Sequence, residues 1–147
     1  MDKQFMDLKR ISNNSGDHGN RDNCSSVLLV DDEVLSQEIG KRLFGQLGYR
    51  VSIADNGIDG IVLCEKRPFD LLIIDYYLPD MRGDELARKI RSGAVNSDTF
   101  IIGMSNDPGH IYRSICMDAG MNETVEKPLT ITLIKDLTSR YVDANNA

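Results

Sequence analysis

Short aliphatic runs alternate with amphipathic stretches along most of the chain, and this alternation predicts an α/β fold. Most of the runs are short and uninterrupted, which suits strands that are buried on both faces of a sheet. Between them, apolar residues recur every three or four positions, as Leu35, Ile39 and Leu43 do, which is the spacing of a helix. The predicted strands cover residues 27–30, 49–54, 70–75, 99–104 and 121–125.

Breaker and capping residues mark the ends of the predicted helices. The helices cover residues 35–47, 58–65, 84–91 and 108–119, and a last stretch that Thr130 caps. Gly48 and Gly120 each follow a helical pattern, at the position where glycine commonly stops a helix. Asp107 and Pro108 predict the N-cap and first turn of the fourth helix. Strands and helices that alternate five times predict a parallel sheet with helices on both faces and right-handed crossovers.

The first 25 residues differ from this pattern in composition. They are rich in small polar residues, which bury too little apolar surface to offset the entropy of ordering. A few apolar positions near the start would share one face of a short helix, but two or three isolated turns are marginal in water. We therefore predict a flexible tail at residues 1–25, one domain at residues 26–142 and a short tail at residues 143–147.

Composition and charge narrow the class of protein. The 147 residues are 41% hydrophobic, enough for one ordinary core, and the formal charge is −6. Basic and acidic residues balance in residues 1–26, so the acid surplus belongs to the domain and argues against direct nucleic-acid binding. The sequence contains neither a signal peptide nor an apolar stretch of membrane-spanning length. Cys24, Cys64 and Cys116 form no metal or disulfide pattern, which favours a reducing compartment, and we expect a cytoplasmic protein.

Side chains that carry chemistry follow the predicted strands where each strand ends. These residues are Asp31 and Asp32, Asp75, Ser105 and Lys127. Because the carboxyl ends of parallel strands share one edge, where ligands bind, we expect the five side chains to converge. Three close carboxylates repel one another unless a cation intervenes, and an oxygen-rich site without imidazole or thiolate suits Mg²⁺.

A carboxylate beside a bound cation can attack phosphorus, because the metal shares the charge of the incoming phosphoryl oxygens. Asp75 is the best candidate nucleophile, since it stands alone at the end of the central strand. Lys127 would supply a second positive charge, and the Ser105 hydroxyl would donate a hydrogen bond to a phosphoryl oxygen. Each of these residues has an ordinary structural explanation by itself, so the prediction depends on their occurring together at successive strand ends.

The pattern resembles the receiver domain of bacterial two-component response regulators over about residues 26–142. The resemblance rests on the acidic pair, on Asp75 followed by Leu78-Pro79-Asp80-Met81-Arg82-Gly83, on Ser105 and on Lys127-Pro128, in the family's order. It implies a flavodoxin-like, doubly wound five-stranded sheet with strand order 2-1-3-4-5 and five helices. It also implies that a histidine kinase or a histidine phosphotransfer protein phosphorylates Asp75.

The same resemblance implies a ligand set for the metal. Asp32 and Asp75 would ligate Mg²⁺ directly, together with the backbone carbonyl of Tyr77, and Asp31 would act mostly through a water molecule. The peptide bond between Lys127 and Pro128 would be cis, as it often is in such domains.

Two residues depart from the family's pattern. The position three before the lysine is commonly aromatic but is Thr124 here, so an aromatic rotamer switch at that position is not expected. The position after the hydroxyl is commonly alanine but is Asn106 here, a larger residue that would narrow access to Asp75 or alter the lifetime of the phosphate. Tyr77 is also bulky and would shield Asp75 from hydrolytic water.

Three functions remain open at this point. The first is a phosphorylation switch rather than an enzyme. The start at Met1 and the lack of a DNA-binding domain favour a stand-alone regulator or a relay shuttle. Such a protein would act by contact with an unknown downstream protein. The second is a degenerate receiver that binds partners without phosphorylation, which Asn106 and Thr124 support. The third is an Mg²⁺-dependent aspartyl-phosphate phosphatase, which would require an acid where Tyr77 stands.

Overall fold

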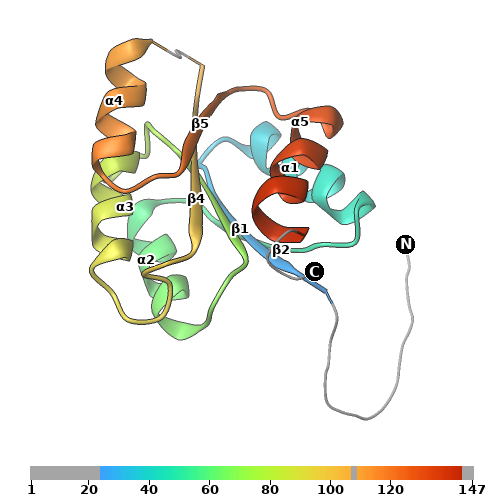
Figure 1. Ribbon diagram of the computed structural model, residues 1–147, viewed down its shortest axis with the longest axis horizontal. Coiled ribbons are helices and arrows are strands. Elements are labelled where there is room, and N and C mark those ends of the chain that lie inside the picture. Colours follow the sequence, from blue (N-terminus) through green and yellow to red (C-terminus); the bar gives the residue numbers. More distant parts are fainter. Residues whose placement is uncertain (1–23, 107–108, 144–147) are drawn as a thin grey trace.

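The computed structural model describes residues 24–106 and 109–143, so most of the predicted N-terminal tail and residues 144–147 lie outside it. Five parallel strands form one sheet in the order β2-β1-β3-β4-β5 (Figure 1). The strands are β1 (Ser26–Val30), β2 (Arg50–Ala54), β3 (Leu71–Asp75), β4 (Phe100–Ser105) and β5 (Glu123–Glu126). The strand order and the alternation with helices confirm the predicted flavodoxin-like fold.

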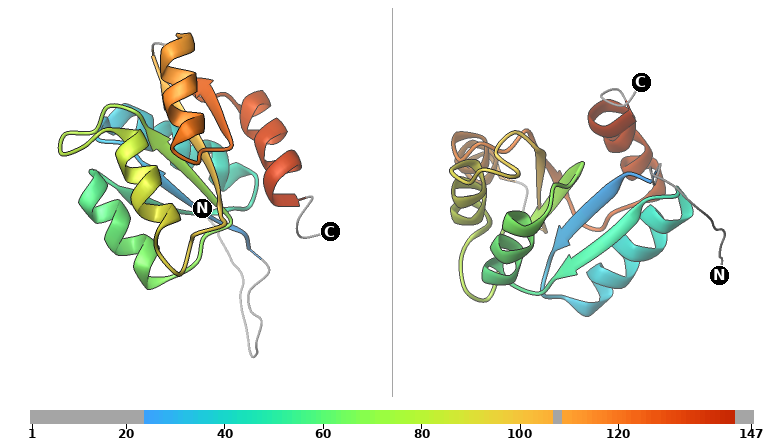
Figure 2. Two further views of the ribbon diagram at one scale, coloured as in Figure 1. Left: turned by 60° about the vertical axis from the view of Figure 1, so that its left-hand side comes forward. Right: turned by 90° about the horizontal axis from the view of Figure 1, so that it is seen from below.

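Helices cover both faces of the sheet (Figures 1 and 2). One face carries α1 (Val34–Gln46) and α5 (Ile131–Thr138), and the other carries α2 (Gly57–Lys66), α3 (Gly83–Arg91) and α4 (His110–Asp118). A π-helix, η1 (Ser139–Asp143), extends α5 and was not predicted from the sequence. In the part of the chain that the structure describes, no helix is both long enough and apolar enough to cross a membrane.

The helix ends agree with the sequence in most places. Gly48 and Gly120 have φ values of 87° and 102°, a left-handed conformation that favours glycine and ends a helix. Thr130 caps α5, because its side chain accepts a hydrogen bond from the Leu133 N–H. The predicted start of the fourth helix was wrong: α4 begins at His110 after an N-cap at Gly109, and the proposed cap, Asp107-Pro108, lies outside the described residues.

The sheet separates two hydrophobic cores. In β1, Leu28 and Val30 face the core under α2, α3 and α4, whereas Val27 and Leu29 face the core under α1 and α5. All five residues of β3 are buried. This burial on both faces explains why the central strands read as continuous aliphatic runs.

Phe44 anchors α1 in the second core, where it has no exposed surface and its ring meets Tyr49 edge to face. We expect Phe44→Ala to lower the free energy of unfolding by about 3–5 kcal/mol, because it removes a buried ring and leaves a cavity. Urea denaturation measures this loss. Leu35→Ala is the matched control on the same helix, since Leu35 is 66% exposed and its loss should change stability by about 0.5 kcal/mol or less. Equal losses in both variants would contradict the assignment of Phe44 to the core.

Candidate functional site

The register of the sheet brings the predicted site residues to one edge. Asp75 pairs with Met104, so Ser105 lies one residue beyond the level of Asp75 on the neighbouring strand. Ser105 pairs with Glu126 in turn, which places Lys127 directly after the last paired residue of β5. Asp75 and Ser105 are buried, as is the Lys127 side chain. The strand ends therefore meet as the sequence predicted.

Lys127 lies between the carboxylates at this edge. Its Nζ atom is 2.9 Å from Asp31 Oδ2, 3.4 Å from Asp75 Oδ2 and 3.4 Å from Glu33 Oε1. Asp31 has no exposed surface, and the Lys127 side chain is 7% exposed. The Lys127 N–H donates to the Ser105 carbonyl at 2.9 Å, and the bond to Pro128 is cis, as the resemblance implied. The amine is thus held inside the acidic cluster by its backbone as well as by charge.

The carboxylates of Asp31, Asp32 and Asp75 form a group that can hold a metal ion. One oxygen from each residue lies within 4.8 Å of the others. Asp31 and Asp75 are buried, whereas Asp32 is exposed and keeps the group open to solvent. The single ammonium of Lys127 contacts two of these three carboxylates, those of Asp31 and Asp75, so the group keeps a surplus of negative charge. Its hard oxygen atoms match the donor preference of Mg²⁺. The residues present therefore fit a magnesium ion.

The electrostatics of the site set Asp75 apart from an ordinary aspartate. Burial and the charge of Asp31 raise the pKa of Asp75 to about 6, against the opposing effect of Lys127 and of a hydrogen bond from the Tyr77 backbone. Burial by itself would lower the pKa of Lys127, but the hydrogen bond and charge of Asp31, with the charges of Asp75 and Glu33, raise it instead. The amine is therefore charged at neutral pH, and a further cation would favour ionised Asp75.

The loop that follows Asp75 folds back beside it. The Gly83 N–H donates to the Tyr76 carbonyl at 2.6 Å, and the Leu78 N–H donates to the Met81 carbonyl at 3.3 Å. A Cβ atom at Gly83 would lie 2.7 Å from the Asp75 carbonyl oxygen, so only glycine permits this close approach. Tyr77 is 63% exposed in this loop, and its carbonyl stays a predicted ligand of the metal.

Thr124, on β5, stands where the family commonly has an aromatic residue, and it makes a polar contact. The Thr124 hydroxyl accepts a hydrogen bond from the Arg113 guanidinium of α4 at 3.4 Å. A tyrosine that the sequence analysis did not single out lies nearby on α4: Tyr112 is 8% exposed, and its ring meets Tyr76 edge to face at 5.0 Å. A Cβ atom at Gly103 would lie 3.1 Å from the Tyr112 hydroxyl oxygen. The glycine inside β4 was the available signal of this close approach.

Sequence reasoning also missed Glu33 as a partner of Lys127. The Glu33 carboxylate accepts a hydrogen bond from the Ser36 hydroxyl at 2.6 Å, and it lies 3.4 Å from the Lys127 amine. The hydrogen bond from Ser36 and the charge of Lys127 lower the pKa of Glu33. Its position directly after the two aspartates was the signal that could have identified it.

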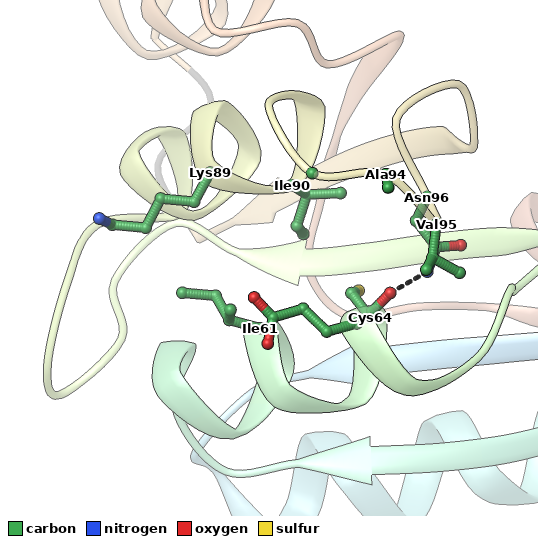
Figure 3. A pocket seen from close by; sticks show the side chains of 9 residues that line it. Ile61, Cys64, Lys89, Ile90, Ala94, Val95 and Asn96 are labelled. Atoms are coloured by element: carbon green, nitrogen blue, oxygen red, sulfur yellow. Dashed lines mark hydrogen bonds between the residues drawn. The ribbon is translucent and has the colours of Figure 1, made fainter.

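An apolar pocket of about 270 Å³ lies between α2 and α3, away from the acidic edge (Figure 3). Its residues have structural roles. Asn96 donates to the Cys64 carbonyl at 2.7 Å and accepts from the Phe69 N–H at 2.9 Å, which joins the loop after α3 to the start of β3. Burial raises the pKa of the Cys64 thiol to about 11, so this cysteine is a poor nucleophile at neutral pH. The acidic edge is therefore the candidate site.

Comparison of the sequence with known proteins agrees with the resemblance described from its motifs. Residues 27–139 match the family model of the response regulator receiver domain. The chain is 31% identical to Two-component response regulator 24 of Arabidopsis thaliana over 108 residues, which cover 73% of this chain and 76% of that protein. It is also 31% identical to Hybrid signal transduction histidine kinase F of Dictyostelium discoideum over 82% of this chain. That match covers 11% of the kinase, so the chain spans about a tenth of its length.

Solved structures show the same likeness. The receiver domain of sensor histidine kinase PA1611 from Pseudomonas aeruginosa PAO1 is 27% identical, with a TM-score of 0.76 over 82% of this chain and 98% of that one. That structure contains a magnesium ion coordinated in its active site cleft. Chemotaxis protein CheY4 of Vibrio cholerae is 22% identical, with a TM-score of 0.77 over 81% of this chain and 99% of that one, and it supports the fold alone.

Proposed function

The chain belongs to the response regulator receiver domain family, and from this premise we propose that it accepts a phosphoryl group on Asp75 in a two-component phosphorelay. The observation that carries the proposal is the position of the Lys127 amine, 3.4 Å from Asp75 and 2.9 Å from Asp31, two of the three carboxylates that can hold a metal ion. The donor is a histidine kinase or a histidine phosphotransfer protein, which the names of the sequence relatives support.

Transfer to Asp75 exchanges one bond to phosphorus for another. An Asp75 carboxylate oxygen forms a bond to phosphorus while the bond from phosphorus to the donor's histidine nitrogen breaks. The nitrogen keeps the electron pair and takes a proton from solvent. Lys127 stabilises the charge on the transferred oxygens, and the Ser105 hydroxyl donates a hydrogen bond to one of them.

The residues that would hold Mg²⁺ are those whose oxygens meet at this edge. They are Asp31, Asp32 and Asp75. The resemblance to receiver domains adds the backbone carbonyl of Tyr77 to this set. When bound, the ion neutralises charge on the phosphoryl oxygens. Asp31 also pairs with Lys127 at 2.9 Å, so one carboxylate positions both positive charges of the site.

The output of this receiver is a change in protein contacts rather than catalytic turnover. An acyl phosphate on Asp75 adds nearly two negative charges beside the loop that follows β4. That charge favours whichever arrangement at the end of β4 brings the Ser105 hydroxyl toward the phosphoryl group, and so shifts the population of a nearby surface. We assign the protein to the cytoplasm as a stand-alone regulator or shuttle whose downstream partner is a protein.

Acetyl phosphate with Mg²⁺ provides the test of this function. We expect intact-protein mass spectrometry to show a gain of one phosphoryl group, which disappears when EDTA removes the metal. No gain under these conditions would favour the degenerate receiver. Repeated turnover of phosphomonoesters would favour the phosphatase, because a switch takes up one group per chain and releases it slowly.

A further inference from the structure

The loop between β3 and α3 contacts the start of α2, and neither the proposed phosphorylation nor the carboxylates of the metal site explain this contact. Asp80 reaches across to the start of α2, where Oδ1 accepts from the Gly57 N–H at 2.8 Å and Oδ2 accepts from the Ile58 N–H at 2.9 Å. These N–H groups belong to the first turn of α2, which has no partners for them within the helix. The local cap of that helix, Asn56, accepts from the Asp59 N–H instead. Asp80 thus supplies a second cap from another part of the chain.

Met81, in the same loop between β3 and α3, packs against the start of α2. A Cβ atom at Gly57 would lie 2.5 Å from both Cγ and Sδ of Met81, so the methionine side chain occupies the space that the glycine leaves. The neighbouring Asp80 is exposed, and so it does not hold the loop by burial. Although partial burial opposes it, the hydrogen bonds from Gly57 and Ile58 lower the pKa of Asp80, which keeps its carboxylate ionised at neutral pH.

We propose that Asp80 is a positioning residue for the cation site, because it fixes the loop that carries the Tyr77 carbonyl to the start of α2. This inference rests on the proposed function, in which that carbonyl is a metal ligand. Tyr77 lies three residues before Asp80 in the same loop, whereas the carboxylate ligands lie at or just beyond the ends of β1 and β3. The Tyr77 carbonyl is therefore the ligand that lies closest along the chain to the contact between Asp80 and α2.

The contact between Asp80 and α2 should affect the affinity for the cation more than the stability of the fold. When the contact is lost, the carboxylates keep their places at the sheet edge, whereas the loop that carries the neutral carbonyl is held less firmly, by its own backbone hydrogen bonds and by Met81. Residues that orient a metal ligand typically contribute about 10-fold to 100-fold to affinity. The carbonyl is a neutral ligand among three carboxylates, so its contribution to metal affinity should lie at the lower end of this range. We therefore expect Asp80→Asn to raise the dissociation constant for Mg²⁺ about 10-fold.

Asp59→Asn is the matched control. Asp59 is also an exposed acid in the first turn of α2, and its side chain contacts Asn56 rather than the loop. Both substitutions remove one negative charge at the start of α2, so their effects on the charge at that helix end are similar. The difference between the two variants isolates the contact with the loop.

Isothermal titration calorimetry with MgCl₂, together with urea denaturation, tests the proposal on the full chain. We expect weaker Mg²⁺ binding in Asp80→Asn and wild-type binding in Asp59→Asn, at a temperature where both are folded. Loss of stability in Asp80→Asn with unchanged Mg²⁺ binding would overturn the proposal and make the contact merely structural. Wild-type protein that takes no phosphoryl group from acetyl phosphate would overturn the proposed function itself, which separates the two failures.

Discussion

Asp75→Asn is expected to take up no phosphoryl group from acetyl phosphate and Mg²⁺, while the variant stays folded. The amide nitrogen and oxygen of asparagine do not form the acyl phosphate, and the nearby carboxylates of Asp31 and Asp32 are committed to Lys127 and to the cation. Intact-protein mass spectrometry measures the uptake, and circular dichroism checks the fold. A phosphoryl group on the variant would show that another residue is the acceptor.

The same variant is expected to be more stable than the wild type when no metal is present. The folded-state pKa of Asp75, about 6, is above its ordinary value of 3.8, so the folded wild type binds this proton more tightly than the unfolded chain does. The contribution of Asp75 to the stability of the wild type therefore falls as the pH rises from about 4 to 6, and the asparagine variant lacks this loss. The advantage of Asp75→Asn should be absent below about pH 4 and should reach about 3 kcal/mol above about pH 6.

Urea denaturation in EDTA across this pH range measures the advantage. Asp98→Asn is the control, because Asp98 is an exposed acid in the loop after α3. It should take up a phosphoryl group as the wild type does and, as a surface substitution, should change stability by about 0.5 kcal/mol or less. An advantage of Asp75→Asn that grew as the pH fell would contradict the raised pKa of Asp75.

The sequence was sufficient to predict the fold and the edge where the site lies, because both follow from local patterns. Strands buried on both faces read as aliphatic runs, and a parallel sheet places the carboxyl ends of its strands at one edge. Asp75 and Lys127 lie 52 positions apart in the chain, yet that rule alone predicted the contact that the structure shows at 3.4 Å. The identity of the acceptor follows from the same rule and stays a prediction until phosphorylation is measured.

The features that could not be predicted depend on side chains that meet across the fold. Asp80 contacts the first N–H groups of a helix that precedes it by more than twenty positions, and its sequence context fits a turn residue equally well. Tyr112 was hidden in an ordinary amphipathic helix, although it lies beside β4 and Tyr76. The start of α4 was misplaced because Asp107-Pro108 has the local pattern of a cap, whereas Gly109 is the N-cap residue in the structure. Local propensity is a weak guide to the residue at which a helix starts, because tertiary structure often overrides it.

Lys127→Ala is expected to have the largest effect on stability of the substitutions at the site. The amine is 7% exposed and lies 2.9 Å from Asp31, which has no exposed surface. Removing one partner of a buried ion pair leaves an uncompensated charge and typically costs about 3–5 kcal/mol. The raised pKa of Lys127 keeps the wild-type amine charged throughout the neutral range, so its contribution is fully present there and is lost only as the pH rises through that raised pKa.

Two conditions should restore much of the stability that Lys127→Ala loses. Saturating Mg²⁺ replaces the missing positive charge, and a pH near 5 protonates Asp75, whose pKa rises further once Lys127 is gone. Urea denaturation at pH 5 and pH 7.5, with EDTA or with MgCl₂, separates these effects, and Lys135→Ala on the exposed face of α5 is the control. A loss of stability that neither Mg²⁺ nor acid reduces would show that Lys127 acts by packing.

Residual uptake of a phosphoryl group by Lys127→Ala is expected, because Asp75 and the other carboxylates remain. Complete loss of uptake would assign the amine an essential part in the transfer itself.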